Sequence, residues 1–362
     1  MNQIKNVALV GAGRVSAHHC KMLSDLADIE LLAICDLNEE IGKPLAQQYS
    51  VRWYNNYHRM LSEHPDIDIV TIATPSGMHH EHTMDIIGRY EKNIIIEKPT
   101  FMRPEQMRQA YDLAASRGTQ IFPVYQNRYN KAVRYVKQAV GKGQLGEVRM
   151  ASVRVRWCRP QRYYDRDPWR GTWSHDGGAL TNQGVHYLDI LRYICGEVKR
   201  VNAVADTLAV EIEVEDAIVA TFEFQNGGMG VIEVTTAARP DDFEASISVV
   251  GSEGLAVISG EATNHLITYS PDPNQCDANS EDFETVYGYG HREMYKNIAD
   301  VLNRNEAPPV SFDDGMSTLN LLHGIYRSVE VGGWIDISEE NQSDRLGRRD
   351  DEISNLYRTP AP

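Results

Sequence analysis

Short apolar runs alternate with helical stretches over the first 124 residues, and this alternation limits the possible folds more than any other feature of the chain. The runs are rich in isoleucine, valine and leucine, and they occupy residues 4–10, 31–35, 69–73, 93–96 and 120–124. When strands and helices alternate, each helix returns the chain over one face of a parallel sheet in a right-handed crossover. We therefore predict an α/β domain with a doubly wound parallel sheet over residues 1–124.

The pattern changes after residue 125. Residues 147–157 predict a long strand, residues 178–194 have the apolar spacing of a helix, and further strand-like runs follow up to residue 258. Asn226-Gly227-Gly228 separates two of these runs in the manner of a hairpin turn. We predict a second, α+β domain with a large, mostly antiparallel open sheet over residues 125–340, followed by a polar tail over residues 341–362.

Charge and cysteine content narrow the classes of function. The chain has 36 lysines and arginines against 51 acids, a net charge of −15, so nucleic acid and anionic membranes are poor partners for it. No stretch approaches the ~18 uninterrupted apolar residues that a membrane span needs. The five cysteines are scattered without a C-x-x-C pair, which is typical of a reducing compartment and argues against a thiolate zinc site. We expect a cytoplasmic protein without nucleic-acid or membrane partners.

The segment Gly11-Ala12-Gly13-Arg14-Val15-Ser16 joins the first strand to the first helix. In a dinucleotide-binding loop, the first glycine makes a tight turn, the second lets the pyrophosphate approach the backbone, and the third position packs the helix on the strand. The third position here is Ser16, which is small. Asp36 ends the second strand, where a carboxylate can bind the ribose hydroxyls. These features predict a Rossmann fold that binds its cofactor through Gly11, Gly13, Arg14, Val15 and Asp36.

The cofactor is predicted to be NAD rather than NADP. Asp36 is followed by Leu37, with no arginine beside it. The 2′-phosphate of NADP would therefore meet an unpaired carboxylate.

Thr74 and Pro75 follow the third strand and face the same crevice, with the histidine-rich segment Met78–His82 behind them. The histidines invite a metal interpretation. A zinc site also needs a third ligand and defined partners behind the ligands, and neither can be read here. We predict no metal, and we predict that Thr74, Pro75 and His79 lie beside the cofactor.

Glu97-Lys98-Pro99 follows the buried strand at residues 93–96. A lysine at the carboxyl end of such a strand points into the cofactor crevice, where the nicotinamide cation could lower its pKa and suit it to proton transfer. A surface lysine before a rigid turn would give the same pattern, and this segment taken alone favours that interpretation.

Six arginines lie between Arg154 and Arg170, against two acids, and aromatic residues are interleaved with them. Arginine offers a fixed fork for phosphate or carboxylate, and aromatic rings can stack on a base or a sugar. The cluster predicts a small-anion site, although some of these arginines also fit a solvated strand edge.

Asn182 and His186 are four residues apart on the predicted helix at residues 178–194, and Asp189 follows on the same face. A histidine in a crevice titrates near neutrality and can act as the acid and base for an alcohol. A hydrogen-bonded core histidine fits the pattern equally well.

Taken together, Gly11–Ser16, Glu97-Lys98-Pro99 and Asn182 with His186 resemble the glucose–fructose oxidoreductase, inositol dehydrogenase and rhizopine-catabolism superfamily of nicotinamide-dependent sugar oxidoreductases. Its most specific marks are E-K-P after a parallel strand and G-V-H on a helix of the second domain. The resemblance covers about residues 4–335. It implies a Rossmann domain followed by a mostly antiparallel sheet that builds homodimers or homotetramers.

One branch of that superfamily is similar in finer detail. The similar segments are Thr74–Gly77, Gln126–Arg128, Trp157–Asp165, Trp169–Trp173, Asp176–Ala179, Asn182–Gln183 and Val286–His291. The branch is that of the UDP-N-acetylglucosaminuronic acid 3-dehydrogenases of bacterial surface-polysaccharide synthesis. It implies NAD-dependent oxidation of the 3-hydroxyl of that nucleotide sugar. Where inositol and glucose dehydrogenases carry aspartate four residues before the histidine, this chain has Asn182, which would not repel an acidic sugar.

The resemblance also implies roles for individual residues. His186 would take the hydroxyl proton, and Lys98 would hydrogen-bond the same oxygen and stabilise its developing charge. The resemblance adds five residues to the set that contacts the cofactor: Glu97, Lys98, Gln126, Trp169 and Arg170. The last two could instead contact the sugar nucleotide. The substrate residues are Lys98, Asn127, Arg159, Tyr163, Asn182, His186 and Tyr287.

Two rival interpretations stay open. One is an NAD(P)-dependent dehydrogenase of a free neutral sugar or cyclitol, which the arginine cluster and Asn182 disfavour. The other is a nucleotide-sensing Rossmann protein without catalysis, which the presence of both Lys98 and His186 disfavours.

Overall fold

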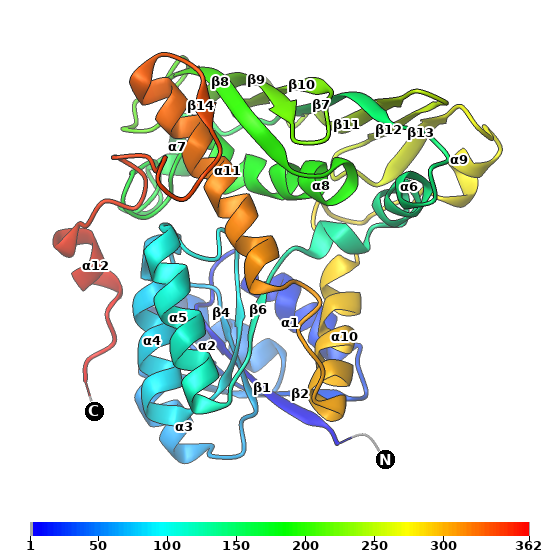
Figure 1. Cartoon of the computed structure of the whole chain (residues 1–362). Helices are drawn as coiled ribbons and strands as arrows, with labels where there is room; N and C mark the ends of the chain where they lie inside the picture. The colour runs from blue at the N-terminus through cyan, green and yellow to red at the C-terminus, as the bar shows by residue number, and fades with distance from the viewer. Residues whose placement is uncertain (1–2, 362) are drawn as a thin grey trace. The chain divides into compact units, whose positions relative to one another are not determined.

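The computed structural model describes residues 3–361, and these form two compact units (Figure 1). Unit 1 contains residues 3–124, 291–315 and 349–361, and unit 2 contains Tyr125–Gly290 and Met316–Arg348. The first segment of unit 1 ends at residue 124. Residues 291–315 and 349–361, which the sequence analysis assigned to the second domain and the tail, pack with unit 1.

Unit 1 is built on a six-stranded sheet in the order β3-β2-β1-β4-β5-β6, in which every neighbouring pair is parallel. The strands are β1 (Lys5–Val10), β2 (Ile29–Cys35), β3 (Arg52–Tyr54), β4 (Ile69–Ile72), β5 (Asn93–Ile96) and β6 (Ile121–Pro123). The predicted doubly wound sheet is confirmed. Only β3 was not predicted, because its three residues, Arg52–Tyr54, include no isoleucine, valine or leucine. The strand order reverses at β1, so the carboxyl ends of β1 and β4 flank the switch point where such sheets bind ligands.

The helices that unit 1 contains among the described residues are α1 (Ser16–Ser24), α2 (Glu39–Gln48), α3 (Tyr57–Glu63), the short η1 (Ser76–Met78), α4 (His79–Tyr90), α5 (Pro104–Arg117), α10 (Gly290–Arg304) and α12 (Asp351–Tyr357). Local chemistry defines their ends. The Asn38 side chain accepts a hydrogen bond from the Glu40 N–H at 2.9 Å and so begins α2. Helix α5 starts with Pro104 in its first turn and ends at Gly118, whose φ of +67° suits glycine.

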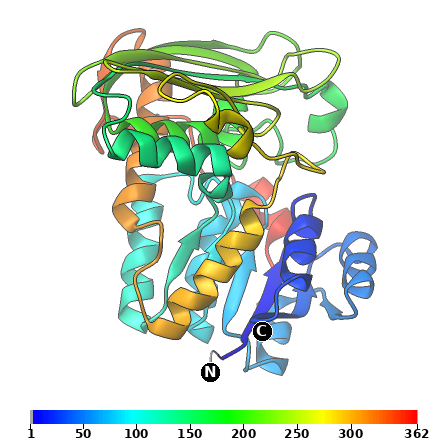
Figure 2. The same cartoon turned by 90° about the vertical axis from the view of Figure 1, so that its right-hand side faces the viewer.

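The two late segments are bound to unit 1 by specific contacts. In α10, the Tyr295 hydroxyl lies 3.0 Å from Thr71 Oγ1 of β4, and Figure 2 shows α10 (gold) against the sheet. After α12, the Arg358 guanidinium contacts both carboxylate oxygens of Glu81 at 2.8–3.0 Å. Unit 1 is therefore completed by two segments that lie far along the chain, one between the two parts of unit 2 and one after them.

Unit 2 contains an eight-stranded sheet in the order β13-β12-β11-β7-β10-β9-β8-β14. The strands are β7 (Val148–Arg156), β8 (Val198–Asp206), β9 (Ala217–Phe224), β10 (Met229–Thr235), β11 (Glu244–Gly251), β12 (Leu255–Ser259), β13 (His265–Tyr269) and β14 (Ile335–Asp336). All neighbours are antiparallel except β7 and β10, which run parallel. The predicted mostly antiparallel sheet is confirmed.

Helices α6 (Lys131–Gly141) and α8 (Val185–Cys195) cover one face of this sheet in Figure 1. The shorter helical segments of unit 2 are η2 (Gln126–Tyr129), α7 (Gln161–Tyr164), η3 (Leu180–Gly184) and α9 (Gln275–Ala278). Helix α11 (Phe312–Val331) carries Ser328, whose hydroxyl accepts a hydrogen bond from the Ala203 N–H of β8 at 2.9 Å. Among residues 3–361, the structure contains no helix long and apolar enough to cross a membrane.

Helix α8 begins later than the sequence predicts. The apolar spacing predicts one helix over residues 178–194, but Leu180–Gly184 form a π-helical turn and α8 starts at Val185. A π-turn inserts one extra residue per turn without changing which residues are apolar, so periodicity does not reveal it. Such turns are frequent at functional sites, and this one carries Asn182.

Candidate active site

The glycine loop of unit 1 makes a tight turn between β1 and α1. Gly11 has a φ of +97°, and a Cβ atom there would lie 2.5 Å from the Ala73 carbonyl oxygen, so only glycine fits. Ser16 is fully buried, and its hydroxyl donates to the Gly11 carbonyl oxygen at 2.7 Å. The residue that replaces the third glycine therefore closes the loop. Gly13 and Arg14 are exposed and Val15 is half-buried at the start of α1, where backbone N–H groups favour an anion.

Asp36 connects the end of β2 to the glycine loop. Its Oδ2 accepts a hydrogen bond from the Ala12 N–H at 2.6 Å, and its Oδ1 accepts one from the Asn38 N–H at 2.7 Å. The carboxylate is thus held beside the loop that would receive the pyrophosphate. This arrangement suits the ribose-binding role predicted for Asp36.

We expect NADH to bind at least about tenfold more tightly than NADPH, because the 2′-phosphate of NADPH would face the Asp36 carboxylate. Fluorescence titration with both reduced cofactors measures the ratio. The matched variant D36N keeps an oxygen acceptor but removes the charge. It should therefore bring the dissociation constants of NADH and NADPH closer together. Tighter binding of NADPH to the unmodified protein would contradict the prediction.

His79 links two loops at the carboxyl edge of the sheet. One ring nitrogen lies 2.9 Å from the Pro99 carbonyl oxygen and the other lies 3.0 Å from the Thr74 carbonyl oxygen. The Thr74 hydroxyl lies 3.0 Å from His82 Nδ1. These contacts hold the loop after β4 against the Glu97–Pro99 turn.

Glu97 is buried in a cluster of groups that come from three separate parts of the chain. Its Oε1 lies 2.9 Å from His19 Nε2 and 3.6 Å from His291 Nε2. Burial alone would raise the pKa of Glu97, but the hydrogen bond from His19 and the neighbouring ring of His291 lower it well below its ordinary value. Its Oε2 accepts a hydrogen bond from the Lys98 N–H at 3.0 Å. The carboxylate therefore orients the backbone of Lys98.

The outer part of this cluster involves α10. Burial lowers the pKa of His291 to about 4, so its ring is neutral at pH 7. The other nitrogen of His19 lies 2.8 Å from the Tyr295 hydroxyl. The donor atoms of His19, Glu97 and His291 all lie within 4.8 Å of one another, a spacing that a metal ion could also use. The 2.9 Å contact between His19 and Glu97 is a direct hydrogen-bond distance, and we interpret the group as a hydrogen-bonded cluster.

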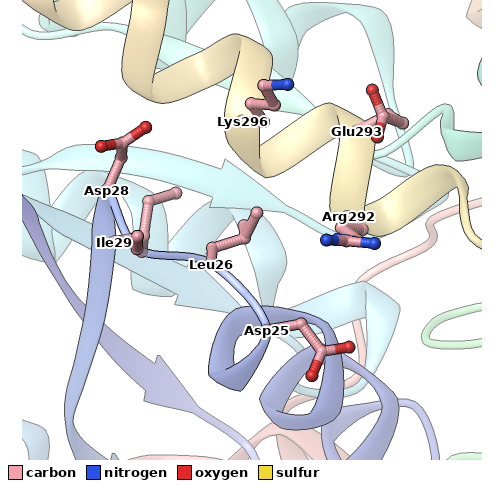
Figure 3. Close-up of a pocket in the computed structure, with 8 residues that line it drawn as sticks. Asp25, Leu26, Asp28, Ile29, Arg292, Glu293 and Lys296 are labelled. Carbon is pink, nitrogen blue, oxygen red and sulfur yellow. The ribbon is translucent and has the colours of Figure 1, made fainter.

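A pocket of about 210 Å³ in unit 1 lies elsewhere (Figure 3). Its lining includes Asp25, Asp28, Arg292, Glu293 and Lys296, all of which are exposed. Asp28 precedes β2, so the pocket adjoins the amino end of that strand, whereas Gly11 and Asp36 lie at carboxyl ends. We do not assign the cofactor to this pocket.

In unit 2, His186 lies near the start of α8 and is 8% exposed. Its Nε2 is 3.5 Å from the amide nitrogen of Gln126, a residue that the sequence analysis assigned to the cofactor. Asp189, predicted on the face of Asn182 and His186, instead forms a buried ion pair with Arg128 through N–O contacts of 2.6 and 2.7 Å. The ion pair secures α8 to the η2 turn, which also contains the buried Asn127.

Asn182 faces a buried carboxylate. Its amide nitrogen donates to Asp176 Oδ1, and its amide oxygen accepts from Gln183 at 3.1 Å. Asp176 is 2% exposed, and sequence reasoning missed its contact with Asn182.

A second buried carboxyl, that of Glu215, lies at the same turn. Its Oε1 accepts hydrogen bonds from the Leu180 N–H and the Tyr326 hydroxyl, each at 2.9 Å. Its Oε2 has no hydrogen-bond partner among residues 3–361. Burial, with the nearby charge of Asp176, raises the pKa of Glu215 to about 8. Glu215 therefore carries a proton at pH 7 in the folded protein.

This proton makes stability depend on pH. Between the ordinary pKa of 4.5 and about 8, Glu215 is ionised in the unfolded chain but protonated in the folded protein. The unfolded state then binds fewer protons, so the free energy of unfolding falls as pH rises, by on the order of 4 kcal/mol across this window. We expect E215Q to gain thermal stability relative to the unmodified protein as pH rises from 5 to 8.5. Calorimetry at each pH measures the difference in melting temperature between E215Q and the unmodified protein. E211Q, at an exposed position, is the control. A difference for E215Q that does not change with pH would contradict the prediction.

The arginine-rich segment is largely neutralised by acids from other strands. Arg154 and Arg156 lie within 4 Å of carboxylates on β10 and β11. Arg159 contacts Asp242 at 2.8 Å. The surplus of positive charge counted along the segment is therefore mostly offset in the folded protein.

The aromatic residues of this segment stack on its arginines. The Arg170 guanidinium lies 4.5 Å from the Tyr163 ring centre and 4.6 Å from that of Trp169, and it donates to the Tyr163 hydroxyl at 2.7 Å. Arg159 lies 5.6 Å from the Tyr163 ring centre. The structure thus brings together Arg159, Tyr163, Trp169 and Arg170. Tyr287 is half-buried in the loop before α10.

Two matches to known families cover most of the chain. Residues 5–125 match an oxidoreductase family with an NAD-binding Rossmann fold, and residues 133–257 match the GFO/IDH/MocA C-terminal domain. The chain belongs to the GFO/IDH/MocA family. The resemblance inferred from the E-K-P and G-V-H motifs is confirmed, and the protein is an oxidoreductase whose Rossmann domain binds NAD.

Two solved structures are similar over nearly the whole chain. The WlbA dehydrogenase from Bordetella pertussis, in complex with NADH and UDP-GlcNAcA, is 33% identical, covers 93% of this chain and 99% of that chain, and has a TM-score of 0.88. The WlbA dehydrogenase from Chromobacterium violaceum, with the same two ligands, is 31% identical, covers 93% and 97%, and has a TM-score of 0.85.

Another relative of the chain is named for a different sugar. The D-glucoside 3-dehydrogenase of Escherichia coli strain K12 is 29% identical over 255 residues, which cover 64% of this chain and 70% of that enzyme. Family membership alone therefore does not identify the sugar substrate.

Proposed function

We propose that the protein oxidises the 3-hydroxyl of UDP-N-acetylglucosaminuronate with NAD, as a dehydrogenase acting on a CH–OH group. The observation that carries the proposal is the 33% identity, over 93% of the chain, to a dehydrogenase crystallised with NADH and UDP-GlcNAcA. The glycine loop and Asp36 provide groups that fit NAD in unit 1. When bound, NAD⁺ accepts the hydride that leaves C3 of the sugar.

We propose Lys98 and His186 as the catalytic residues. His186 takes the proton of the sugar hydroxyl, so that an alcohol becomes a ketone as the hydride leaves. Lys98 donates a hydrogen bond to the same oxygen and stabilises the charge that develops there. The positive charge of Lys98 can serve the role that a metal plays in other alcohol oxidations, so we propose a reaction without a metal. The orientation of the Lys98 backbone by Glu97 supports its assignment.

We assign the sugar nucleotide to residues of unit 2. Arg159, Tyr163 and Arg170 form one stacked group, which offers guanidinium forks and an aromatic face for diphosphate and uracil. Asn182 carries no charge and would tolerate a uronate. Asn127 and Tyr287 complete the proposed set.

A neutral-sugar dehydrogenase is the second candidate, and one observation favours it. Most arginines between Arg154 and Arg170 already have acidic partners, which leaves less free positive charge for a dianionic diphosphate than the sequence suggests. The 29% identity to D-glucoside 3-dehydrogenase agrees with this alternative. A nucleotide sensor would bind the same ligands without turnover.

Steady-state kinetics with two nucleotide sugars separates these functions. UDP-N-acetylglucosamine lacks only the carboxylate, so losing one charge-assisted contact should lower kcat/KM by about 10–150-fold relative to UDP-N-acetylglucosaminuronate. Methyl glucoside serves as the neutral free-sugar control. Equal rates on the two nucleotide sugars would refute the uronate assignment, and absence of turnover on all three would favour a sensor.

We also propose that the protein assembles as a homodimer or homotetramer through the sheet of unit 2. Apolar side chains on three adjacent strands of that sheet are exposed: Met150, Met229 and Val219 are 55%, 59% and 45% exposed. An apolar patch of this kind marks a partner surface. Light scattering should give two or four times the chain mass, and a monomer would refute the assembly.

A further inference from the structure

The segment that precedes α8 is held by one buried carboxylate. Asp176 is 2% exposed, and its Oδ2 accepts a hydrogen bond from the Gly171 N–H at 2.7 Å. Its Oδ1 accepts the hydrogen bond from the Asn182 amide. Asp176 therefore joins the end of the arginine-rich segment to the π-turn that leads to His186.

Asp176 interacts electrostatically with one basic residue and with two residues that are acidic when ionised. The attraction between Asp176 and Arg170 favours the charged form of Arg170. Asp176 also contributes to the raised pKa values of Tyr164 and Glu215, whose charged forms are anionic. A further anion at this place would therefore face an existing carboxylate, with a protonated carboxyl behind it.

These contacts specify what residue 182 must be. The Asn182 amide presents its nitrogen to Asp176 and its oxygen to Gln183, so both of its polar atoms are used in one orientation. An aspartate at residue 182 would set two carboxylates against each other, and they could coexist only by sharing a proton. An asparagine at residue 176 could still accept from the Gly171 N–H while donating to residue 182.

We propose that Asp176 is a positioning residue that works as a pair with Asn182, and that keeping the charge at residue 176 rather than at residue 182 allows the site to accept an acidic sugar. The inference rests on the proposed function. According to this proposal, the site tolerates a uronate because the single negative charge of the pair lies on residue 176 and not on residue 182. The orientation of the π-turn before His186 depends on the hydrogen bond within the pair.

Exchange of the two residues tests the pair. D176N loses the charge that orients the amide, and N182D creates a carboxylate pair, so each should lower kcat/KM for UDP-N-acetylglucosaminuronate by roughly 10–100-fold. The double variant D176N/N182D restores the hydrogen bond with the charge moved to residue 182. Its kcat should return to within about fivefold of the unmodified protein, while its preference for the acidic over the neutral nucleotide sugar falls at least about tenfold. D165N, in the same segment but exposed, is the control and should change neither value.

A pH profile gives a second measurement that a purely structural role would not alter. The carboxylate pair in N182D should share a proton more readily at low pH, so its kcat relative to the unmodified protein should rise as pH falls from 8 to 6. This measurement decides the question if D176N does not fold. A double variant no better than the worse single variant, unchanged kinetics in D176N, or an N182D profile parallel to that of the unmodified protein would overturn the proposal. Failure of the proposed function is recognised separately, because the unmodified protein would then lack a preference for the acidic sugar.

Discussion

Replacing Lys98 with methionine is expected to lower kcat by at least about 10²-fold while the fold and NADH binding are retained. Removal of one preorganised donor to a developing oxyanion has a cost of this size, and methionine keeps the length of the side chain without its charge. Lys98 is half-buried and follows β5, and its backbone N–H is held by Glu97, so the backbone contact survives the substitution. Steady-state kinetics and fluorescence titration with NADH measure the two properties.

Lys92 provides a matched control for this variant. It precedes the same strand at the opposite end, where its ammonium donates to the Pro65 carbonyl oxygen at 2.8 Å. K92M should therefore keep its kcat. If K98M also kept a near-normal kcat, Lys98 would have a structural role only.

The second large effect is expected for His186→Asn, which should lower kcat by roughly 10²–10⁴-fold, the usual contribution of a general acid–base group. Asparagine is polar and smaller than histidine, and α8 is secured to the η2 turn by the ion pair of Asp189 with Arg128, so the local structure should persist. The pH profile of kcat should lose the limb that reports the imidazole. H265N, on the half-exposed edge strand β13, should leave kcat and the profile unchanged. An effect of H186N on KM alone would assign His186 to substrate binding.

Local patterns were sufficient to predict much of unit 1. Gly11 and Asp36 could be recognised because the strand, loop, helix and acid of a Rossmann domain follow each other within about 30 residues. The parallel sheet could be predicted because alternation of strands and helices leaves few topologies. The strong β-branched character of β4 and β5 made these strands readable without any long-range information.

The surroundings of Lys98 could not be predicted in this way. Glu97 lies 78 residues from His19 in the sequence, and His291 belongs to α10, which follows the first seven strands of the unit 2 sheet, β7 to β13. No period or spacing links these residues, because their proximity results from tertiary packing. Only the family-like segment that ends at His291 gave a signal.

Charge was misjudged for a related reason. The sequence analysis compares the arginines between Arg154 and Arg170 only with the acids of their own segment. Their partners in the structure include Glu233 on β10 and Asp242 in the loop before β11. Neighbouring strands in a sheet can be distant in sequence, so a local charge count does not give the field of the folded protein. The π-turn at Asn182 escaped prediction because it changes the hydrogen bonding but not the pattern of apolar residues.

The discontinuity of unit 1 has a consequence for biosynthesis. The ribosome releases the first six strands early, but α10, with His291 and Tyr295, emerges only after residues 125–290 have been made. At about 5–20 residues per second, that interval is on the order of 10–30 s. During this time the Glu97 carboxylate does not yet have its neighbour His291, and the surface that α10 will cover is open to water. The unit that carries the NAD-binding loop begins the chain but is the last of the two to become complete.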